Sequence, residues 1–120
     1  MFKTILKAIC AEHGYLCCVA ALSTGEEVAR EGDFSSLRWR GLANSLFGDR
    51  DRIIQLNDSL EGRLLPQVYG QGEVFCLVMK PVDDLLVGAF GQDGRDFLRL
   101  YSEGKQISER IMNELGSPSP

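Results

Sequence analysis

The segment spanning residues 64–101 constrains the fold more than any other, because it holds three apolar runs separated by two short turn signals. The turn signals are Gly-Gln-Gly at residues 70–72 and Pro-Val-Asp-Asp at residues 81–84. Short loops containing Gly, Pro or Asp are typical of antiparallel hairpins. The segment therefore predicts a three-stranded meander whose two faces the rest of the chain must cover. The expected strands span residues 64–69, 74–79 and 85–90.

Two further strands are expected upstream of the meander. Residues 15–22 form the continuous apolar run YLCCVAAL, which is typical of a strand covered on both faces. After a turn at residues 23–25, residues 26–31 are rich in charged side chains, which suits an edge strand protected from aggregation. Pro66 lacks an N–H group, so the strand at residues 64–69 should also lie at an edge or begin late. The unpaired groups of such an edge invite pairing with another subunit.

Two helices are expected near the ends of the chain. In residues 2–13 apolar side chains recur at helical spacing, and Gly14 supplies a stop after His13. His13 is expected at the edge of the apolar face or in a favourable interaction with the helix C-terminus. A closing helix is expected over residues 95–115, where Gly104 would permit close contact with the sheet.

The borders of the closing helix are also indicated by the sequence. Asp93 precedes it and is expected to cap its N-terminus. Residues 116–120, with the sequence GSPSP, cannot continue a helix and are expected to form a disordered tail. The single predicted domain therefore spans residues 1–115.

The longest expected helix spans residues 36–61, and either Ser35 or Ser36 can cap it. Apolar residues spaced by seven lie near one line of this helix: Trp39, Leu46, Ile53 and Leu60. Another side carries a stripe of mostly small residues: Leu37, Gly41, Asn44, Ser45, Gly48 and Ser59. Small side chains allow a second helix to approach closely, so we predict a helix-to-helix dimer contact there, with simple exposure to water as the alternative. Gly48, beside the charged run DRDR, is where the helix could break or kink.

Composition excludes several classes of function. A net charge of −4 over 120 residues does not provide the basic face that duplex nucleic acid requires. No apolar run approaches the ~20 residues of a membrane span, and the N-terminus lacks the pattern of a signal peptide. With 44% hydrophobic and 25% charged residues, the chain is expected to be a globular, cytoplasmic protein.

We find no catalytic or metal-binding pattern in the sequence. The adjacent Cys17 and Cys18 must point to opposite faces of a strand, and no two cysteines form a C-x-x-C pair. We therefore interpret the four cysteines as reduced, buried thiols, with a redox or metal role as the alternative. There is no phosphate-binding G-x-x-x-x-G-K-[ST] loop, and the adjacent carboxylates at residues 83–84 are expected to be solvated. The prediction is a non-enzymatic protein with no cofactor and no metal.

The order of elements resembles the roadblock/dynein light chain 7 domain, a family that includes bacterial gliding-motility regulators of Ras-like GTPases. The resemblance covers nearly the whole chain. It is strongest in residues 72–111, GEVFCLVMKPVDDLLVGAFGQDGRDFLRLYSEGKQISERI, where a hairpin of apolar strands leads directly into the closing helix. It implies an α+β fold with a five-stranded antiparallel sheet of order 2-1-5-4-3. The long helix would cover one face, and the two terminal helices the other.

The resemblance also implies a homodimer in which the third strands pair and the long helices pack together. Gln67, Val68 and Tyr69 would then form the edge contact, alongside the small-residue stripe. The implied function is a non-enzymatic module that binds a small Ras-like GTPase and modulates its nucleotide cycle. On the long helix, Arg38, Arg50 and Arg52 are candidate partner contacts, although the charged run after Gly48 departs from the expected helix.

Two other functions remain open from the sequence. One is a structural scaffold that gathers other subunits without affecting any nucleotide cycle. The other is a small-ligand sensor with a cavity between the sheet and the long helix, near Trp39 and Phe75, although the sequence favours a plain core position for Trp39.

Overall fold

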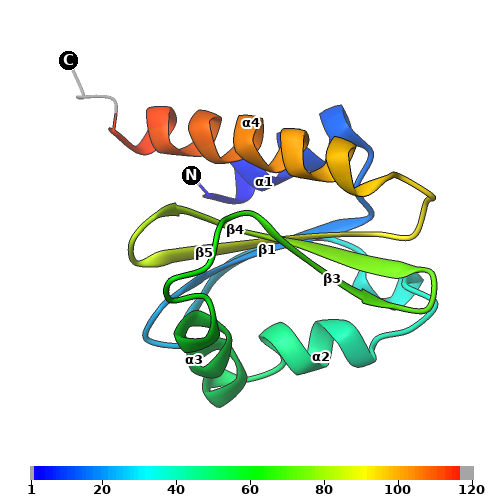
Figure 1. Cartoon of the computed structure of the whole chain (residues 1–120), viewed down its shortest axis with the longest axis horizontal. Helices are drawn as coiled ribbons and strands as arrows, with labels where there is room; N and C mark the ends of the chain where they lie inside the picture. Colours follow the sequence, from blue (N-terminus) through cyan, green and yellow to red (C-terminus); the bar gives the residue numbers. More distant parts are fainter. Residues whose placement is uncertain (1, 117–120) are drawn as a thin grey trace.

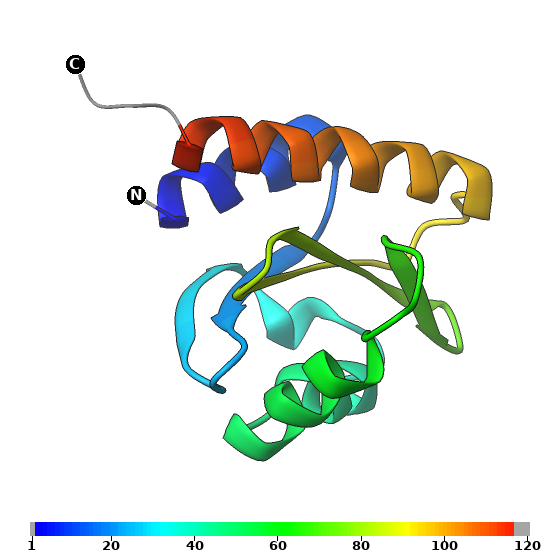
Figure 2. The same ribbon diagram turned by 60° about the vertical axis from the view of Figure 1, so that its left-hand side comes forward.

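The computed structural model describes residues 2–116 and contains one five-stranded antiparallel sheet between two layers of helices (Figures 1 and 2). The elements in chain order are α1 (Phe2–His13), β1 (Cys17–Leu22), β2 (Glu27–Gly32), the 3-10 turn η1 (Phe34–Ser36), α2 (Gly41–Phe47), α3 (Arg50–Ser59), β3 (Gln67–Gln71), β4 (Val74–Val82), β5 (Leu85–Gly91) and α4 (Phe97–Gly116). The strand order is β2-β1-β5-β4-β3, which confirms the predicted order.

The three inner strands, β1, β5 and β4, are buried on both faces, because a layer of helices covers each face of the sheet. Successive side chains of a strand point to opposite faces, so each inner strand contributes to two separate cores. Towards α2 and α3, the core contains Val19, Val78, Leu86, Phe47 and Ile53. Towards α1 and α4, it contains Ala20, Leu77, Val87, Leu6 and Ile107. Residues 17–22 of the predicted run 15–22 thus form a doubly covered strand, while Leu16 lies before it and is exposed.

The predicted single long helix is wrong: the structure has two helices, α2 and α3, with a break at Gly48 and Asp49. Asp49 has an extended backbone (φ −156°, ψ 177°), and its carboxylate accepts a hydrogen bond of 2.9 Å from the Arg52 N–H. This is the geometry of a helix N-cap, so the charged run begins a new helix instead of continuing the old one. In Figure 1, α3 is viewed nearly end-on while α2 lies across the view, so the two helices point in different directions.

The residues before α2 consequently differ in position from those predicted for a single long helix. Neither Ser35 nor Ser36 caps the following helix, because α2 begins only at Gly41, with Arg40 at its N-cap position and no side-chain cap. The two serines lie in the 3-10 turn, which Asp33 caps by accepting the Ser35 N–H at 2.9 Å. Leu37 follows this turn and is buried in the core at 4% exposure, so it is not part of the exposed stripe. Trp39, predicted on the apolar line, is 50% exposed.

The closing helix also begins differently from the prediction. Asp96, and not Asp93, caps α4, because its carboxylate accepts the Arg99 N–H at 2.8 Å. Asp93 instead binds the side chain of Arg95 at 2.7 Å. The helix continues through Gly116, the first residue of the predicted tail, and the remainder of that tail lies outside the described residues.

Gly104 permits the predicted close contact between α4 and the sheet. A Cβ atom built on Gly104 would lie 2.6 Å from Cγ of Pro66 and 3.3 Å from Cδ1 of Leu77. The proline ring belongs to the segment that leads into β3, so α4 also covers the start of this strand. A larger residue at this position would separate the helix from the sheet.

We therefore predict that Gly104→Leu lowers the free energy of unfolding by about 1–3 kcal/mol, because the added side chain overpacks a filled contact. Urea unfolding followed by circular dichroism measures the change. The matched control is Gly94→Leu, since a Cβ at Gly94 meets nothing within 4 Å. Equal stabilities for the two variants would contradict the contact between α4 and Pro66.

Candidate interaction surface

The edge strand β3 is open on one side and carries no charge. Within the described part of the chain it pairs only with β4, from Gln67 opposite Val78 to Gln71 opposite Val74. Its side chains at Gln67, Val68 and Tyr69 are half-buried. The opposite edge strand, β2, instead carries Glu27, Arg30 and Glu31, charges that discourage further pairing. Of the two edges, β3 is therefore the one suited to accept another strand.

The solvent face of α2 is formed by small residues. Gly41, Asn44, Ser45 and Gly48 are exposed, whereas Leu42, Ala43, Leu46 and Phe47 face the core. Four of the six predicted stripe residues are thus brought together. Ser59 is exposed at the end of α3, where its hydroxyl donates to the carbonyl of Leu56, so it belongs to a different helix from the other four.

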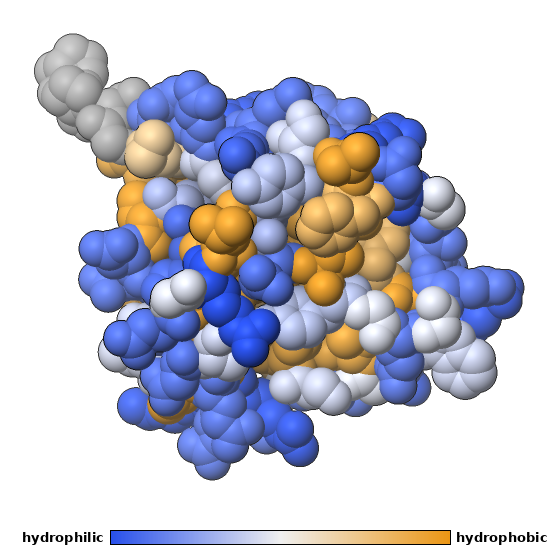
Figure 3. Space-filling model, viewed as in Figure 1, coloured by the Kyte–Doolittle hydropathy of each residue, from blue (hydrophilic) through white to orange (hydrophobic). Residues whose placement is uncertain are grey.

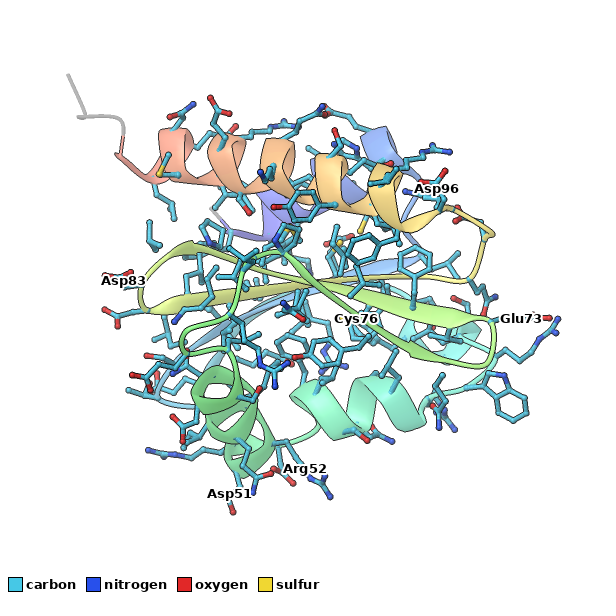
Figure 4. All side chains as sticks on the ribbon, viewed as in Figure 1. Asp51, Arg52, Glu73, Cys76, Asp83 and Asp96 are labelled. Carbon is cyan, nitrogen blue, oxygen red and sulfur yellow. The ribbon has the colours of Figure 1, made fainter. Side chains whose placement is uncertain are left out.

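The start of α2 contacts the turn between β3 and β4. A Cβ on Gly41 would lie 2.9 Å from the side-chain amide of Gln71, and a Cβ on Gly72 would lie 2.7 Å from Nε1 of Trp39. The Arg38 guanidinium forms an ion pair of 2.7 Å with Glu73, which Figure 4 shows at the tip of this turn. The small-residue face and the open edge are therefore neighbours. We call Trp39, Gly41, Asn44, Ser45, Gly48 and Gln67–Gln71 together the α2–β3 surface.

A hollow of about 200 Å³ lies along α2, from Arg40 before its first residue to Gly48 after its last. Its walls include Asn44 and Gly48 of the α2–β3 surface, together with Arg30 and Arg40. The Arg30 guanidinium lies 4.2 Å from the ring centre of Phe34 and pairs with Glu27 at 2.6 Å. Sequence reasoning missed Arg30 and Arg40, because the two are distant in the chain and only the fold brings them to one hollow.

The structure does not bring the three predicted contact arginines together. Arg38 lies at the β3–β4 turn. Arg50 packs over the β1–β2 turn, where a Cβ on Gly25 would lie 2.4 Å from its Cγ. Arg52 points away from the sheet on α3 (Figure 4). Sequence reasoning also missed the exposure of Trp39, although its charged neighbours Arg38 and Arg40 were a signal for a surface position.

The proposed ligand cavity near Trp39 and Phe75 does not form, because the two residues are on opposite sides of the sheet. Phe75 belongs to the core under α1 and α4, whereas Trp39 lies before α2. A shallow hollow of about 350 Å³ lies elsewhere, between α4, the segment at Pro66 that leads into β3, and the end of β4 at Pro81. Figure 3 shows apolar side chains on this side of the molecule, mixed with polar ones. Exposed apolar residues include Leu64, Phe97, Leu98 and Met112.

A buried ion network joins the loop between α1 and β1 to α4 and the loop before it, on the face opposite to α2. The Tyr15 hydroxyl donates to Oε1 of Glu103 at 2.8 Å, and Arg95 donates to the same oxygen at 2.9 Å. Arg99 binds the other oxygen of Glu103 at 2.9 Å, and Arg95 also donates to the Gly14 carbonyl. The side chains of Arg95 and Glu103 are 4% and 12% exposed.

Electrostatics in this network favour the ionised form of Glu103. Burial raises the pKa of Glu103, but the hydrogen bonds from Tyr15 and Arg99 and the charge of Arg95 outweigh it, so the pKa is lowered from its ordinary value near 4.5. Burial, together with the bond to Glu103, raises the pKa of Tyr15 and keeps its hydroxyl protonated as a donor. His13, predicted near the end of α1, stacks beside Tyr15 with its Nδ1 3.9 Å from Glu103.

Residues 2–116 contain neither a metal-binding group of side chains nor a membrane-spanning helix. No group of three or more His, Cys, Asp or Glu side chains is arranged to hold a metal ion. None of the helices in this range is both long enough and apolar enough to cross a membrane.

Comparisons with solved structures identify the fold. MglB from Myxococcus xanthus superimposes with a TM-score of 0.71 at 8% identity, covering 97% of this chain and 95% of that one. MglC from the same organism gives 0.66 at 14% identity, covering 94% and 98%. A Roadblock/LC7 domain from Streptomyces avermitilis gives 0.61 at 13% identity, covering 94% and 96%. The chain has the roadblock/LC7 fold.

No protein-family model and no curated protein matches the sequence. The likeness to the roadblock/LC7 fold is therefore found by comparing structures, and it covers nearly the whole chain, as the resemblance in sequence implied.

We predict that Glu103→Gln lowers the free energy of unfolding at pH 7 by about 1–3 kcal/mol, because it removes the buried carboxylate partner of Arg95 and leaves only the half-exposed Asp93. The pKa of Glu103 is lowered by folding, so its stabilisation is present above its ordinary value near 4.5 and is lost as the pH falls through the lower folded value. The difference between variant and parent should therefore shrink in acid, which urea unfolding at several pH values measures.

The control for this prediction is Glu114→Gln on the same helix. Glu114 forms only a 3.6 Å pair with Arg110 and is 42% exposed, so its loss should change stability little. A stability difference at Glu103 that does not depend on pH would argue against the ionised network.

Proposed function

We propose that this roadblock/LC7-fold chain is a homodimeric regulatory or adaptor module that binds a small Ras-like GTPase and modulates its nucleotide cycle. The observation that carries the proposal is the α2–β3 surface, where an uncharged open edge adjoins the small-residue face of α2. An edge without protective charges is exposed to unwanted pairing unless a specific partner covers it. A second copy of the chain is the partner that we infer.

In the proposed dimer, β3 of each subunit pairs antiparallel with β3 of the other, and the two copies of α2 pack across the same axis. Such a contact is isologous, so the same surface serves both subunits. The dimer residues are Gly41, Asn44, Ser45, Gly48, Gln67, Val68 and Tyr69. Leu37, which we first placed here, instead supports α2 from the core. One of the similar solved structures is described as MglB with a tetrameric arrangement, which supports self-association for this fold.

The proposed GTPase keeps its own hydrolytic machinery, and the module acts by preferring one of its conformations. Among the similar folds, MglB from Thermus thermophilus is named a gliding protein. The regulatory role in our proposal comes from the family resemblance. Arg38, Arg50 and Arg52 remain the proposed contacts. Because they are spread over the α2 and α3 layer, we expect them to contribute separately, with Arg40 in the adjoining hollow as a further cation.

The dimer contact predicts that Gly41→Arg weakens self-association at least about tenfold, or ~1.4 kcal/mol, while the fold is retained. A bulky charge would separate the helix faces, whereas within the subunit it displaces only the flexible Gln71 side chain. Mass in solution over a dilution series measures the dissociation constant. Gly94→Arg, at a site open to solvent, is the matched control.

A second pair of variants tests the edge strand. Val68→Lys on β3 should weaken the dimer, whereas Val28→Lys on the opposite edge strand should not, since Val28 is 42% exposed on β2. A dimer that survives both Gly41→Arg and Val68→Lys would place the interface elsewhere.

The regulatory role predicts that the dimer changes GTP hydrolysis or nucleotide release by a Ras-like GTPase encoded near this gene. Single-turnover hydrolysis and nucleotide-release rates, with and without the protein, measure the change. We expect Arg38→Ala, Arg50→Ala or Arg52→Ala to reduce the effect without altering the dimer. Unchanged rates with stable co-elution would favour the scaffold alternative, and the absence of both would reject GTPase binding.

A further inference from the structure

Two thiols from different elements are in direct contact on the face of the sheet opposite to α2. The Sγ atoms of Cys10 on α1 and Cys18 on β1 are 2.9 Å apart and share a hydrogen bond. Cys18 is fully buried at 0% exposure, whereas Cys10 is half-buried. A disulfide bond measures about 2.05 Å, so the two sulfur atoms need only a small approach to become bonded.

The other two cysteines lie apart from this pair. Cys17 and Cys76 face the core under α2 and α3, whereas Cys18 faces the core under α1 and α4. Both are at 0% exposure and hold free thiols. Burial raises the pKa of each, which keeps them protonated and unreactive. The chain therefore contains one pair of thiols in contact, Cys10 and Cys18, and two isolated thiols, Cys17 and Cys76, that serve as internal controls for oxidation.

The contact also shifts the pKa values of Cys10 and Cys18 in opposite directions. The hydrogen bond with Cys18 lowers the pKa of Cys10, although burial and the nearby Glu31 carboxylate oppose it. The same hydrogen bond, together with burial, raises the pKa of Cys18. Cys10 is the more exposed of the two thiols and the one whose pKa is lowered, so it is the one that an oxidant reaches first, with the buried Cys18 in contact with it.

We infer that Cys10 and Cys18 form a redox-active pair that a hydroperoxide converts into a reversible disulfide between α1 and β1. In the first step the Cys10 thiolate attacks a peroxide oxygen, the O–O bond breaks, and the leaving hydroxide takes up a proton to become water. Cys10 is oxidised to sulfenic acid, and the peroxide is reduced. In the second step the Cys18 sulfur attacks the Cys10 sulfur, the S–O bond breaks, and the Cys18 proton leaves with the hydroxide as water. A dithiol reductant reverses the bond.

The disulfide would fix the end of α1 to the sheet without touching the α2–β3 surface. β1 is separated from β3 by β5 and β4, and α1 lies on the opposite face from α2 (Figures 1 and 2). Oxidation is therefore expected to stabilise the subunit and to leave self-association unchanged. The inference does not depend on the proposed GTPase regulation.

The test treats the reduced full-length chain with hydrogen peroxide, unfolds it in an alkylating reagent and digests it with a protease that cleaves after glutamate. Cleavage after Glu12 separates Cys10 from Cys18, so the disulfide appears as two joined peptides. We expect Cys10 and Cys18 to become joined, Cys17 and Cys76 to remain alkylated, and dithiothreitol to restore all four thiols. The thermal midpoint of the oxidised protein should rise by roughly 5 °C.

Cys10→Ala is the control variant, because it removes the exposed member of the pair and places a good helix former in α1. It should show neither the joined peptides nor the thermal shift. In Cys18→Ala, if it folds, Cys10 sulfenic acid should persist and react with a cyclic dione probe. Alkylation of Cys10 and Cys18 at full yield after peroxide, oxidation of Cys10 with Cys18 still free, or disulfides between molecules would each overturn the inference.

Discussion

A sheet whose inner strands carry apolar side chains on both faces is stable in water only between two layers of helices, and this requirement governs the whole chain. Residues of β1, β4 and β5 alternate between two cores, and each core needs a cover. With α1 and α4 on one face and α2 and α3 on the other, all four helices are used for the faces. Within residues 2–116 no helix covers an edge of the sheet. Each edge strand must therefore avoid unwanted pairing through its own charged side chains, or be covered by a partner.

The layer of α1 and α4 is held in place by a network that draws on distant parts of the chain. Tyr15 is far in sequence from Arg95 and Glu103, and the hydrogen bonds among the three satisfy polar groups that would be costly to bury unpaired. Arg95 also lies 4.5 Å from the ring centre of Tyr15. The network therefore ties the loop before α4 to the end of α1, in the same layer as the paired thiols of Cys10 and Cys18.

Local patterns predicted the elements well and their long-range relations less well. The strands, the stop at Gly14 and the contact at Gly104 follow from periodicity and residue size, which act over a few residues. Leu46, Ile53 and Leu60 kept their heptad spacing across the break because both helices pack on one core, so spacing alone could not distinguish one helix from two. The N-cap at Asp49 is the feature that divides this segment into two helices. The Glu103 network and the hollow with Arg30 and Arg40 join segments that no local pattern relates.

The break after α2 changes what a dimer of this chain must rely on. The helix face beside β3 extends only from Gly41 to Gly48, and a helix of that length spans roughly 10 Å. Because α3 turns away, it cannot lengthen the contact along the same line. In the proposed dimer, the backbone hydrogen bonds of β3 would then supply the direction and register of the contact, while the small residues of α2 would permit close approach. With so short a helix face, most of the specificity of the proposed self-association would come from the five residues of the edge strand β3.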